Sequence, residues 1–343
     1  MHLQMSRLLS PLKLGPYRLR NRIAMPPMAS ETADERGMAT DTTVAYYAPR
    51  ARAGTALIIV EHTYVVPQGR RSRHQLGLYS DDHVAPIRRV AEAIKAEGAV
   101  AAIQLTHAGA AADHELIGCA PEAPSEVRPP GRPNAAQPTA MSPARVAEVQ
   151  RAFVDAAVRA WRAGFQVIEL HAAHGYLLNQ FFSPLTNLRS DAYGGSMENR
   201  LRFSLETVAM VRAALPDDAV VAMRLGADDG FEGGITLEDS VWAAPRLVEA
   251  GVGFLDISGG LAGSGRDRFG PDAPAEGYFA RLAEAIRRVV DVPVMVTGGI
   301  VNPSTADALV GKGVADVIGV GRAMLSDPDW SSRAMRELAA AEL

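Results

Sequence analysis

The chain has 343 residues, of which 48% are hydrophobic and 22% charged, and its formal net charge is −4. This apolar share can fill a large core, and the basic residues are too scattered to form a surface that binds nucleic acid. Cys119 is the only cysteine. Its isolation excludes an intramolecular disulfide, a cysteine-ligated zinc site and a cysteine-ligated iron–sulfur cluster.

The opening segment MHLQMSRLLSPLKLG has no apolar run long enough for a signal peptide, and no later run approaches a membrane span. We therefore expect a cytoplasmic protein that acts on a small molecule, with neither a membrane nor nucleic acid as partner. Length alone leaves the domain count open, because a single α/β barrel with extended loops also exceeds about 250 residues.

Short apolar runs alternate with helical patterns along the whole chain. The expected strands are 22–25, 55–60, 100–106, 166–170, 220–225, 254–258, 293–297 and 316–320. The expected helices are 43–53, 82–97, 145–163, 196–214, 236–250, 279–290, 303–312 and a last one from Ser331. Continuous apolar strands are typical of a parallel sheet buried on both faces, and right-handed crossovers then favour a closed (β/α)8 TIM barrel. We expect residues 1–343 to form one such domain.

Three loops of this barrel are extended, after the third, fourth and sixth strands. The segments 108–143 and 259–278 are too long for simple connectors, and we expect both to project over the C-terminal mouth as lids or pocket walls. Disordered linker is the alternative interpretation. Ser142 before Pro143 predicts a helix N-cap and first turn, whereas Pro245 predicts a kink or a break in its helix.

Barrel chemistry lies at the C-terminal ends of the strands, and there this sequence is rich in polar residues and glycine. The positions are Pro26, Pro27, Met28, Glu61, His62, Gln104, His107, His171, His174, Arg224, Ser258, Gly259, Gly260, Gly298, Gly299, Gly321 and Arg322. Glycines after the last two strands, together with Arg322, predict a phosphate site, with tight-turn glycines as the alternative. Neither a GxGxxG nor a GxxxxGKS/T motif opens a helix after a strand, which argues against a dinucleotide fold or a triphosphate loop.

The segment 167–200 combines a strand, a polar loop and a helix, and the loop carries His171, His174 and Tyr176. Neutral imidazoles and a phenol can steady a developing oxyanion and deliver a proton. Ordinary polar loop residues are the alternative, because an HxxH pair alone is a weak motif. A zinc hydrolase would need a third ligand that the sequence does not supply, and no lysine at a strand end offers a Schiff base.

Strand pleating also makes a prediction about Glu169. Counting back in twos from His171 places Glu169 on the inward face of the same strand, where an unpaired carboxylate would be costly. We expect it to pair with a polar or cationic neighbour on the third or fifth strand, with Arg224 as the best candidate.

Several segments together resemble the Old Yellow Enzyme family of FMN-dependent ene-reductases, nearest its thermophilic-like branch. They are PPM, IQLTHAG, ELHAAHGYLLNQFFSPLTNLRSDAYGGSMENR, AMRLGADD, VTGGI and IGVGRAMLSDP, and the likeness runs from Leu9 to Trp330. It implies bound FMN, NADPH or NADH as hydride donor, and ping-pong reduction of the activated C=C bond of α,β-unsaturated carbonyl compounds. A flavin-binding relative without turnover is the rival interpretation, because fold does not guarantee activity.

The resemblance also implies roles for individual residues. Those matching cofactor-binding positions are Pro27, Met28, Gln104, Arg224, Gly299, Gly321 and Arg322. Gln104 would meet the pyrimidine edge of the flavin, and Arg224 would face its N1 and O2 region. His171 and His174 match the pair that binds the substrate carbonyl oxygen, and Tyr176 matches the proton donor.

Some positions depart from the pattern of the thermophilic-like branch. Ala29 stands where a cysteine near the flavin is common, Glu31 where a substrate-binding tyrosine is common, and His62 where a small residue is usual. Glu31 and His62 either shape the substrate pocket or face solvent. The chain ends at Leu343 without the tail that carries an arginine into a neighbouring subunit's site. We therefore expect a site not shared between subunits, and leave a homo-oligomer open.

Overall fold

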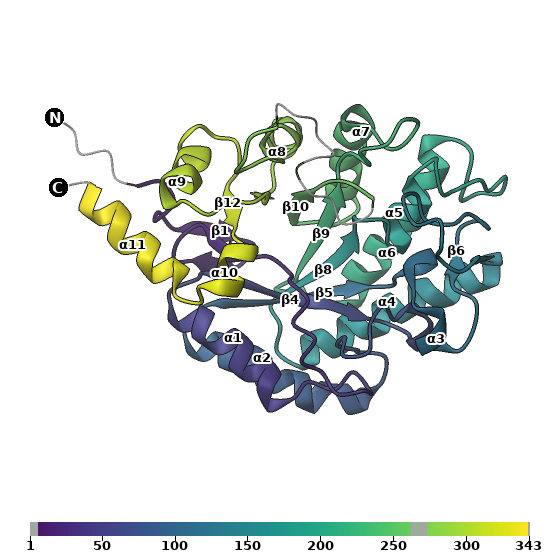
Figure 1. Cartoon of the computed structure of the whole chain (residues 1–343), viewed down its shortest axis with the longest axis horizontal. Helices are drawn as coiled ribbons and strands as arrows, with labels where there is room; N and C mark the ends of the chain where they lie inside the picture. The colour runs from purple at the N-terminus through teal and green to yellow at the C-terminus, as the bar shows by residue number, and fades with distance from the viewer. Residues whose placement is uncertain (1–5, 262–265, 267–272, 342–343) are drawn as a thin grey trace.

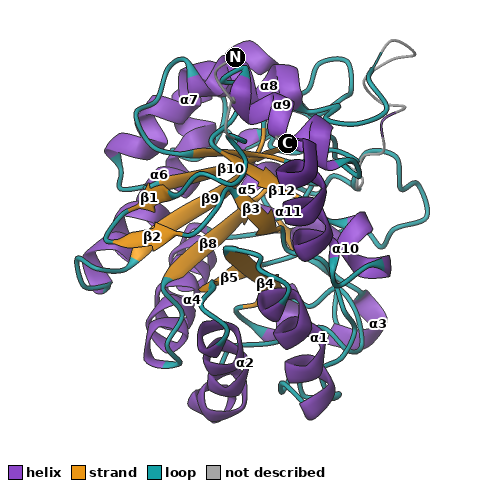
Figure 2. Cartoon of the chain, turned by 90° about the vertical axis from the view of Figure 1, so that its left-hand side faces the viewer, coloured by secondary structure: helices purple, strands orange, loops and turns teal. Residues whose placement is uncertain are grey.

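The computed structural model describes residues 6–261, 266 and 273–341, and within them eight parallel strands form a closed barrel. The strands are β3 (Ile23–Met25), β4 (Leu57–Tyr64), β5 (Val100–Thr106), β8 (Val167–Ala172), β9 (Val220–Gly226), β10 (Phe254–Ser258), β11 (Val294–Val296) and β12 (Val317–Gly319). Pairing of β12 with β3 closes the ring. Helices surround the strands on the outside (Figures 1 and 2). The predicted (β/α)8 barrel is confirmed.

Each barrel strand leads into a long helix. These are α1 (Asp41–Arg52), α2 (Val84–Ala96), α4 (Pro143–Arg162), α6 (Met197–Ala214), α7 (Leu237–Glu249), α8 (Ala280–Arg287), α9 (Pro303–Gly311) and α11 (Trp330–Ala341). Ser142 caps α4 as predicted, because its side chain accepts a hydrogen bond from the backbone N–H of Arg145. None of the described helices is both long enough and apolar enough to cross a membrane.

Helix α7 runs without interruption through Pro245, so of the predicted kink or break the break is wrong, whereas the kink stays a prediction. Proline removes one backbone hydrogen bond from a helix, but packing of an apolar face supplies most helix stability in proteins. Ala243, Ala244 and Leu247 on this helix are fully buried. Their packing holds the helix together across the proline.

The interior of the barrel changes from apolar to polar along its axis. Inward residues near the N-terminal ends of the strands form one apolar cluster, which includes Val167, Val220 and Phe254. A hairpin of β1 (Leu12–Leu14) and β2 (Tyr17–Leu19) adds two leucines to this cluster and closes that end. Toward the C-terminal ends the strands carry buried polar side chains, namely Gln104, Glu169, His171, Arg224 and Asp256. The sequence therefore places its polar groups where barrel chemistry takes place.

Strand β4 continues to Tyr64, past its predicted end at Val60. Its pairing with β5 changes register between Val60 and Thr63, so Glu61 and His62 occupy an irregularity of the bulge type. Bulges re-aim side chains and are frequent beside active sites. The buried carboxylate of Glu61 accepts hydrogen bonds from the Ser30 N–H over 2.8 Å and from the Tyr47 hydroxyl over 3.1 Å. Glu61 thereby anchors the segment that follows β3.

The extended loops have structure of their own where they are described. The loop before α4 contains η3 (Gly109–Ala111), α3 (His114–Ile117) and a small sheet of β6 (Glu122–Ala123) and β7 (Thr139–Ala140). The loop after β8 contains α5 (Leu177–Phe182). Half of the predicted excursion 259–278, namely 262–265 and 267–272, lies outside the described residues.

Candidate active site

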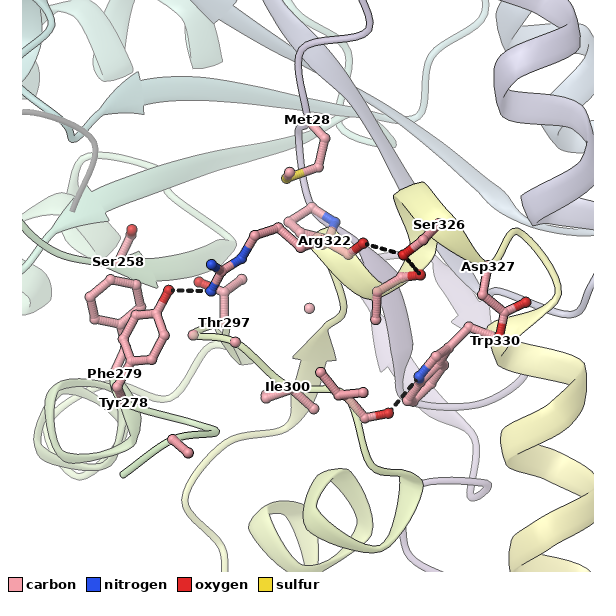
Figure 3. A pocket seen from close by; sticks show the side chains of 18 of the residues that line it. Met28, Ser258, Tyr278, Phe279, Thr297, Ile300, Arg322, Ser326, Asp327 and Trp330 are labelled. Carbon is pink, nitrogen blue, oxygen red and sulfur yellow. Dashed lines mark hydrogen bonds between the residues drawn. The ribbon is translucent and has the colours of Figure 1, made fainter. Parts of the chain in front are cut away.

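A cavity of about 840 Å³ opens at the C-terminal ends of the barrel strands (Figure 3). Half of the predicted site residues border it: Met28, His174, Arg224, Gly299, Gly321 and Arg322. Its volume is in the range of cavities that bind small molecules and cofactors. The fold therefore brings these residues to one cavity, as expected for strand ends of a barrel, although they come from five different strands.

Two glycines after β11 shape one side of this cavity. Gly298 and Gly299 have φ angles of 120° and 72°, a region that only glycine adopts freely. A Cβ on Gly298 would lie 3.0 Å from the backbone nitrogens of Tyr278 and Phe279. The turn is therefore restricted to glycine by both conformation and space, and such turns let backbone N–H groups approach an anion closely.

Gly321 continues this glycine cradle after β12. A Cβ there would come to 3.0 Å from Sδ of Met28. The short helix α10 (Arg322–Ser326) begins at the next residue, and the guanidinium of Arg322 donates a hydrogen bond to the Tyr278 hydroxyl over 3.2 Å (Figure 3). Barrels commonly bind phosphate between the loops after their last two strands and a short extra helix. The geometry of Gly299, Gly321 and Arg322 matches that arrangement. Tyr278, the partner of Arg322, was not identified from the sequence.

Arg224 contributes a buried cation to the same cavity. Its Nε lies 3.2 Å from Oδ2 of Asp256, its in-register neighbour on β10. The distance is that of an ion pair, but the N–H is not aligned for a hydrogen bond with the carboxylate. Burial raises the pKa of Asp256 to about 6, against the attraction of Arg224. Sequence reasoning missed Asp256 because strand register decides which side chains become neighbours.

Glu169 is fully buried, as its predicted inward position requires. Its Oε1 accepts a hydrogen bond from Nε2 of Gln104 on β5 over 2.8 Å. The predicted polar partner on the third barrel strand is confirmed, but Arg224 as best candidate is wrong, because register places Arg224 beside Asp256. Burial, and then the charge of Asp256, raise the pKa of Glu169 well above its usual range. The charge of Arg224 acts in the opposite direction, although Arg224 forms its ion pair with Asp256.

The rings of His62, His171, His174 and Tyr176 form one cluster beside the cavity. The His171 ring centroid lies 5.2 Å from that of His174 and 4.8 Å from that of Tyr176, both edge to face. His62 stacks on Tyr176 with centroids 5.8 Å apart. Nδ1 of His171 is buried and has no hydrogen-bond partner among the described residues. The predicted donors are thus in contact with one another, and His174 connects them to the cavity.

Burial keeps all four rings uncharged. It lowers the pKa values of His171 and His174 far below the usual range, with smaller contributions from nearby cations and imidazoles. It lowers the pKa of His62 to about 4 and raises the pKa of Tyr176, against the effects of two arginines. At neutral pH the cluster therefore presents neutral N–H and O–H donors, which suits stabilisation of an oxyanion and delivery of a proton.

Ser258 fixes the orientation of His174. The backbone of His174 has a φ of 61°, a conformation that costs a non-glycine residue roughly 1–3 kcal/mol. Its Nε2 lies 2.7 Å from the hydroxyl of Ser258, which is buried at the end of β10. This contact occupies Nε2 and leaves Nδ1 as the nitrogen of His174 that can meet another partner.

Replacing Ser258 by alanine is expected to weaken binding of a phenol ligand by about tenfold, the loss of one buried hydrogen bond. The binding constant is measured by isothermal titration calorimetry. Ser258→Thr retains the hydroxyl and is expected to bind within about threefold of the wild type. Equal weakening in both variants would mean that space rather than the hydrogen bond matters.

The remaining predicted positions differ in their surroundings. Glu31 is exposed, and its carboxylate accepts hydrogen bonds from the Ser72 hydroxyl over 2.6 Å and the His74 N–H over 3.3 Å. Of the two alternatives left open, Glu31 takes the solvent-facing one, whereas His62 faces Tyr176. Pro27 and Gln104 are buried and do not border the cavity.

A barrel with a glycine cradle after its last two strands and a buried cation at other strand ends belongs to the class that binds a phosphate-bearing cofactor at its mouth. Within this class, the chain belongs to the NADH:flavin oxidoreductase / NADH oxidase family, whose model matches residues 7–341. The Old Yellow Enzyme resemblance is thereby confirmed. Membership assigns FMN as the cofactor and a nicotinamide nucleotide as the hydride donor.

Known proteins match this chain over most of its length. An NADH oxidase of Thermoanaerobacter brockii is 41% identical over 94% of this chain and 50% of that protein, so the chain spans about half of its length. An NADPH dehydrogenase of Geobacillus thermodenitrificans is 38% identical over 96% of this chain and 94% of its own. The solved Old Yellow Enzyme homologue of Zymomonas mobilis is 27% identical with a TM-score of 0.83, and the match covers 96% of this chain and 92% of the homologue.

The cavity fits FMN by its own geometry. The glycine cradle and Arg322 suit a phosphate. The guanidinium of Arg224 borders the cavity and would place a positive charge near a bound flavin, which would favour its anionic reduced form. The buried Nδ1 of His171 and the neutral ring cluster supply further polar groups beside the same cavity.

Proposed function

We propose that the protein reduces the activated C=C bond of α,β-unsaturated carbonyl compounds, with NADPH or NADH as the source of hydride. The observation that carries this proposal is the contact of His171, His174 and Tyr176, all neutral, at the edge of a cavity that suits FMN. Bound FMN supplies a ring that takes up a hydride from the nicotinamide and gives it to the alkene.

The residues proposed to hold FMN are those predicted from the sequence: Pro27, Met28, Gln104, Arg224, Gly299, Gly321 and Arg322. In this assignment Gly299, Gly321 and Arg322 bind the phosphate, and Arg224 faces the pyrimidine side of the ring. The whole chain would act as one FMN-binding domain, with the 108–143 loop covering its mouth.

The histidines would bind the carbonyl oxygen of the substrate. His171 and His174 each offer an N–H to the negative charge that gathers on this oxygen as the β-carbon is reduced. A positioned donor of this kind contributes on the order of 3 kcal/mol to the transition state. Tyr176 would then give its hydroxyl proton to the α-carbon. Burial of the phenol raises its pKa and so keeps this proton on Tyr176 at neutral pH.

The decisive experiment uses the absorbance spectrum of the purified protein. The expected result is a yellow flavin spectrum that NADPH bleaches without oxygen and cyclohexenone restores. Bleaching that cyclohexenone and related enones, maleimides and nitroalkenes all fail to reverse would refute alkene reduction. A flavin spectrum that neither nicotinamide nucleotide changes would instead indicate a flavin-binding protein without turnover.

A further inference from the structure

Two arginines stand at the entrance to the proposed substrate site. Arg71 follows β4, and Arg132 lies in the long loop between β5 and α4. Both border one surface cavity of about 550 Å³. Arg132 also borders a small cavity that it shares with His174 and Gly175. Arg132 therefore lies between the outer cavity and the proposed carbonyl-binding histidine.

The charges of Arg71 and Arg132 act on each other and on Tyr176. Burial, and then the charge of Arg71, lower the pKa of Arg132. Both cations in turn lower the pKa of Tyr176, although burial outweighs them. Like charges that are partly removed from water repel each other strongly. The pair is therefore a costly arrangement unless an anion binds to it.

The acidic side chains nearby do not neutralise this pair. Within residues 6–261, 266 and 273–341, neither guanidinium forms an ion pair. The carboxylate of Glu31 is bound to Ser72 and His74 instead. In the outer cavity, Asp113 caps α3 by accepting from backbone N–H groups, and Glu115 is exposed.

We propose that Arg71 and Arg132 bind an oxyanion carried by the molecule in the substrate site, so that the preferred substrates are enones bearing a carboxylate. This inference rests on the proposed function. Guanidinium groups bind carboxylate and phosphate oxygens through paired hydrogen bonds. An anion between the two arginines relieves their repulsion and lies on the approach to His174. Phosphates of the nicotinamide nucleotide have the same chemistry, and the test separates the two sources.

The first test compares acetylacrylate, a carboxylated enone, with its methyl ester in steady-state kinetics of the holoenzyme. Arg71→Gln and Arg132→Gln are each expected to raise KM for acetylacrylate by about tenfold or more, the loss of one charge-assisted hydrogen bond. The KM for the ester should change by less than about twofold. Arg73→Gln is the matched control, because it removes the same charge from the Arg71 loop, where Arg73 pairs with exposed Glu35.

The second test measures flavin reduction by NADPH, NADH and N-benzyl dihydronicotinamide, which has no phosphate. If the anion is a nucleotide phosphate, both arginine variants slow reduction by the nucleotides alone, and the acetylacrylate and ester results do not differ. This outcome would still support an oxyanion site at Arg71 and Arg132, but with a nucleotide phosphate instead of a substrate carboxylate as its ligand. Variants that behave like Arg73→Gln in both tests would overturn the proposal.

Ligand binding distinguishes failure of this inference from failure of the proposed function. Titration with para-hydroxybenzoate and its methyl ester, followed by flavin absorbance, needs no turnover. If no enone is reduced, a wild-type preference for the carboxylate that Arg71→Gln and Arg132→Gln abolish would still support the anion site. Equal binding of acid and ester would contradict the proposed carboxylate preference even in an active ene-reductase.

Discussion

Replacing Tyr176 by phenylalanine is expected to slow alkene reduction by about 10²- to 10⁴-fold, the usual contribution of a positioned general acid. Flavin reduction by NADPH should stay within about twofold, because that half-reaction needs no proton from the substrate side. Burial raises the pKa of Tyr176, so the phenol keeps its proton at neutral pH and has it ready for the α-carbon. Anaerobic stopped-flow absorbance at the flavin band measures the two half-reactions separately.

The substitution leaves the aromatic contacts in place, which makes its result easy to interpret. A phenylalanine ring retains the stacking on His62 and the edge contact with His171. His171→Ala is a useful companion, since loss of a carbonyl donor should weaken binding of phenol ligands as well as slow the reaction. Equal slowing of both half-reactions by Tyr176→Phe would show that the phenol is not the proton donor.

Local patterns in the sequence were sufficient to predict the barrel and six of the residues around the cavity. Strands buried on both faces need continuous apolar runs, and these were visible. A parallel barrel brings all C-terminal strand ends to one face, so Met28, His174, Arg224 and Arg322 could be grouped without contact information. Glycine was informative at Gly299 because its positive φ favours that residue type.

Features that depend on register or on loop paths could not be predicted in this way. The pairing of Arg224 with Asp256 follows from the alignment of β9 with β10. The bulge at Glu61 and His62 follows from the change of register between β4 and β5. Arg132 reaches the entrance through a loop of more than thirty residues, 107–142, whose course has no periodicity to read. A single sequence shows the residue type at such positions, but it does not show which residues become their neighbours in the fold.

The two buried carboxyl groups inside the barrel allow a second test, of stability against pH. Asp256 is fully buried and has a pKa of about 6, above the value near 3.9 of an unfolded aspartate. A raised carboxyl pKa means that folding is favoured while the group is protonated, and that this stability is lost as pH rises from about 4 through 6. The loss is on the order of 3 kcal/mol. Asp256→Asn should abolish it, so the variant is expected to exceed the wild type in unfolding free energy at pH 7 and to match it near pH 4.

Glu169→Gln is the companion variant in this pH series. Burial, and then the charge of Asp256, raise the pKa of Glu169 well above its usual range, against the attraction of Arg224. The same sign argument applies to this carboxyl group, so Glu169→Gln should also reduce the loss of stability as pH rises above about 4, which urea unfolding followed by circular dichroism measures at each pH. If Asp256→Asn instead loses stability at pH 7, the attraction between Asp256 and Arg224 outweighs the cost of burying the carboxylate. The expected stabilisation would have a functional cost, because an Arg224 without its counter-charge should raise the midpoint potential of the bound flavin.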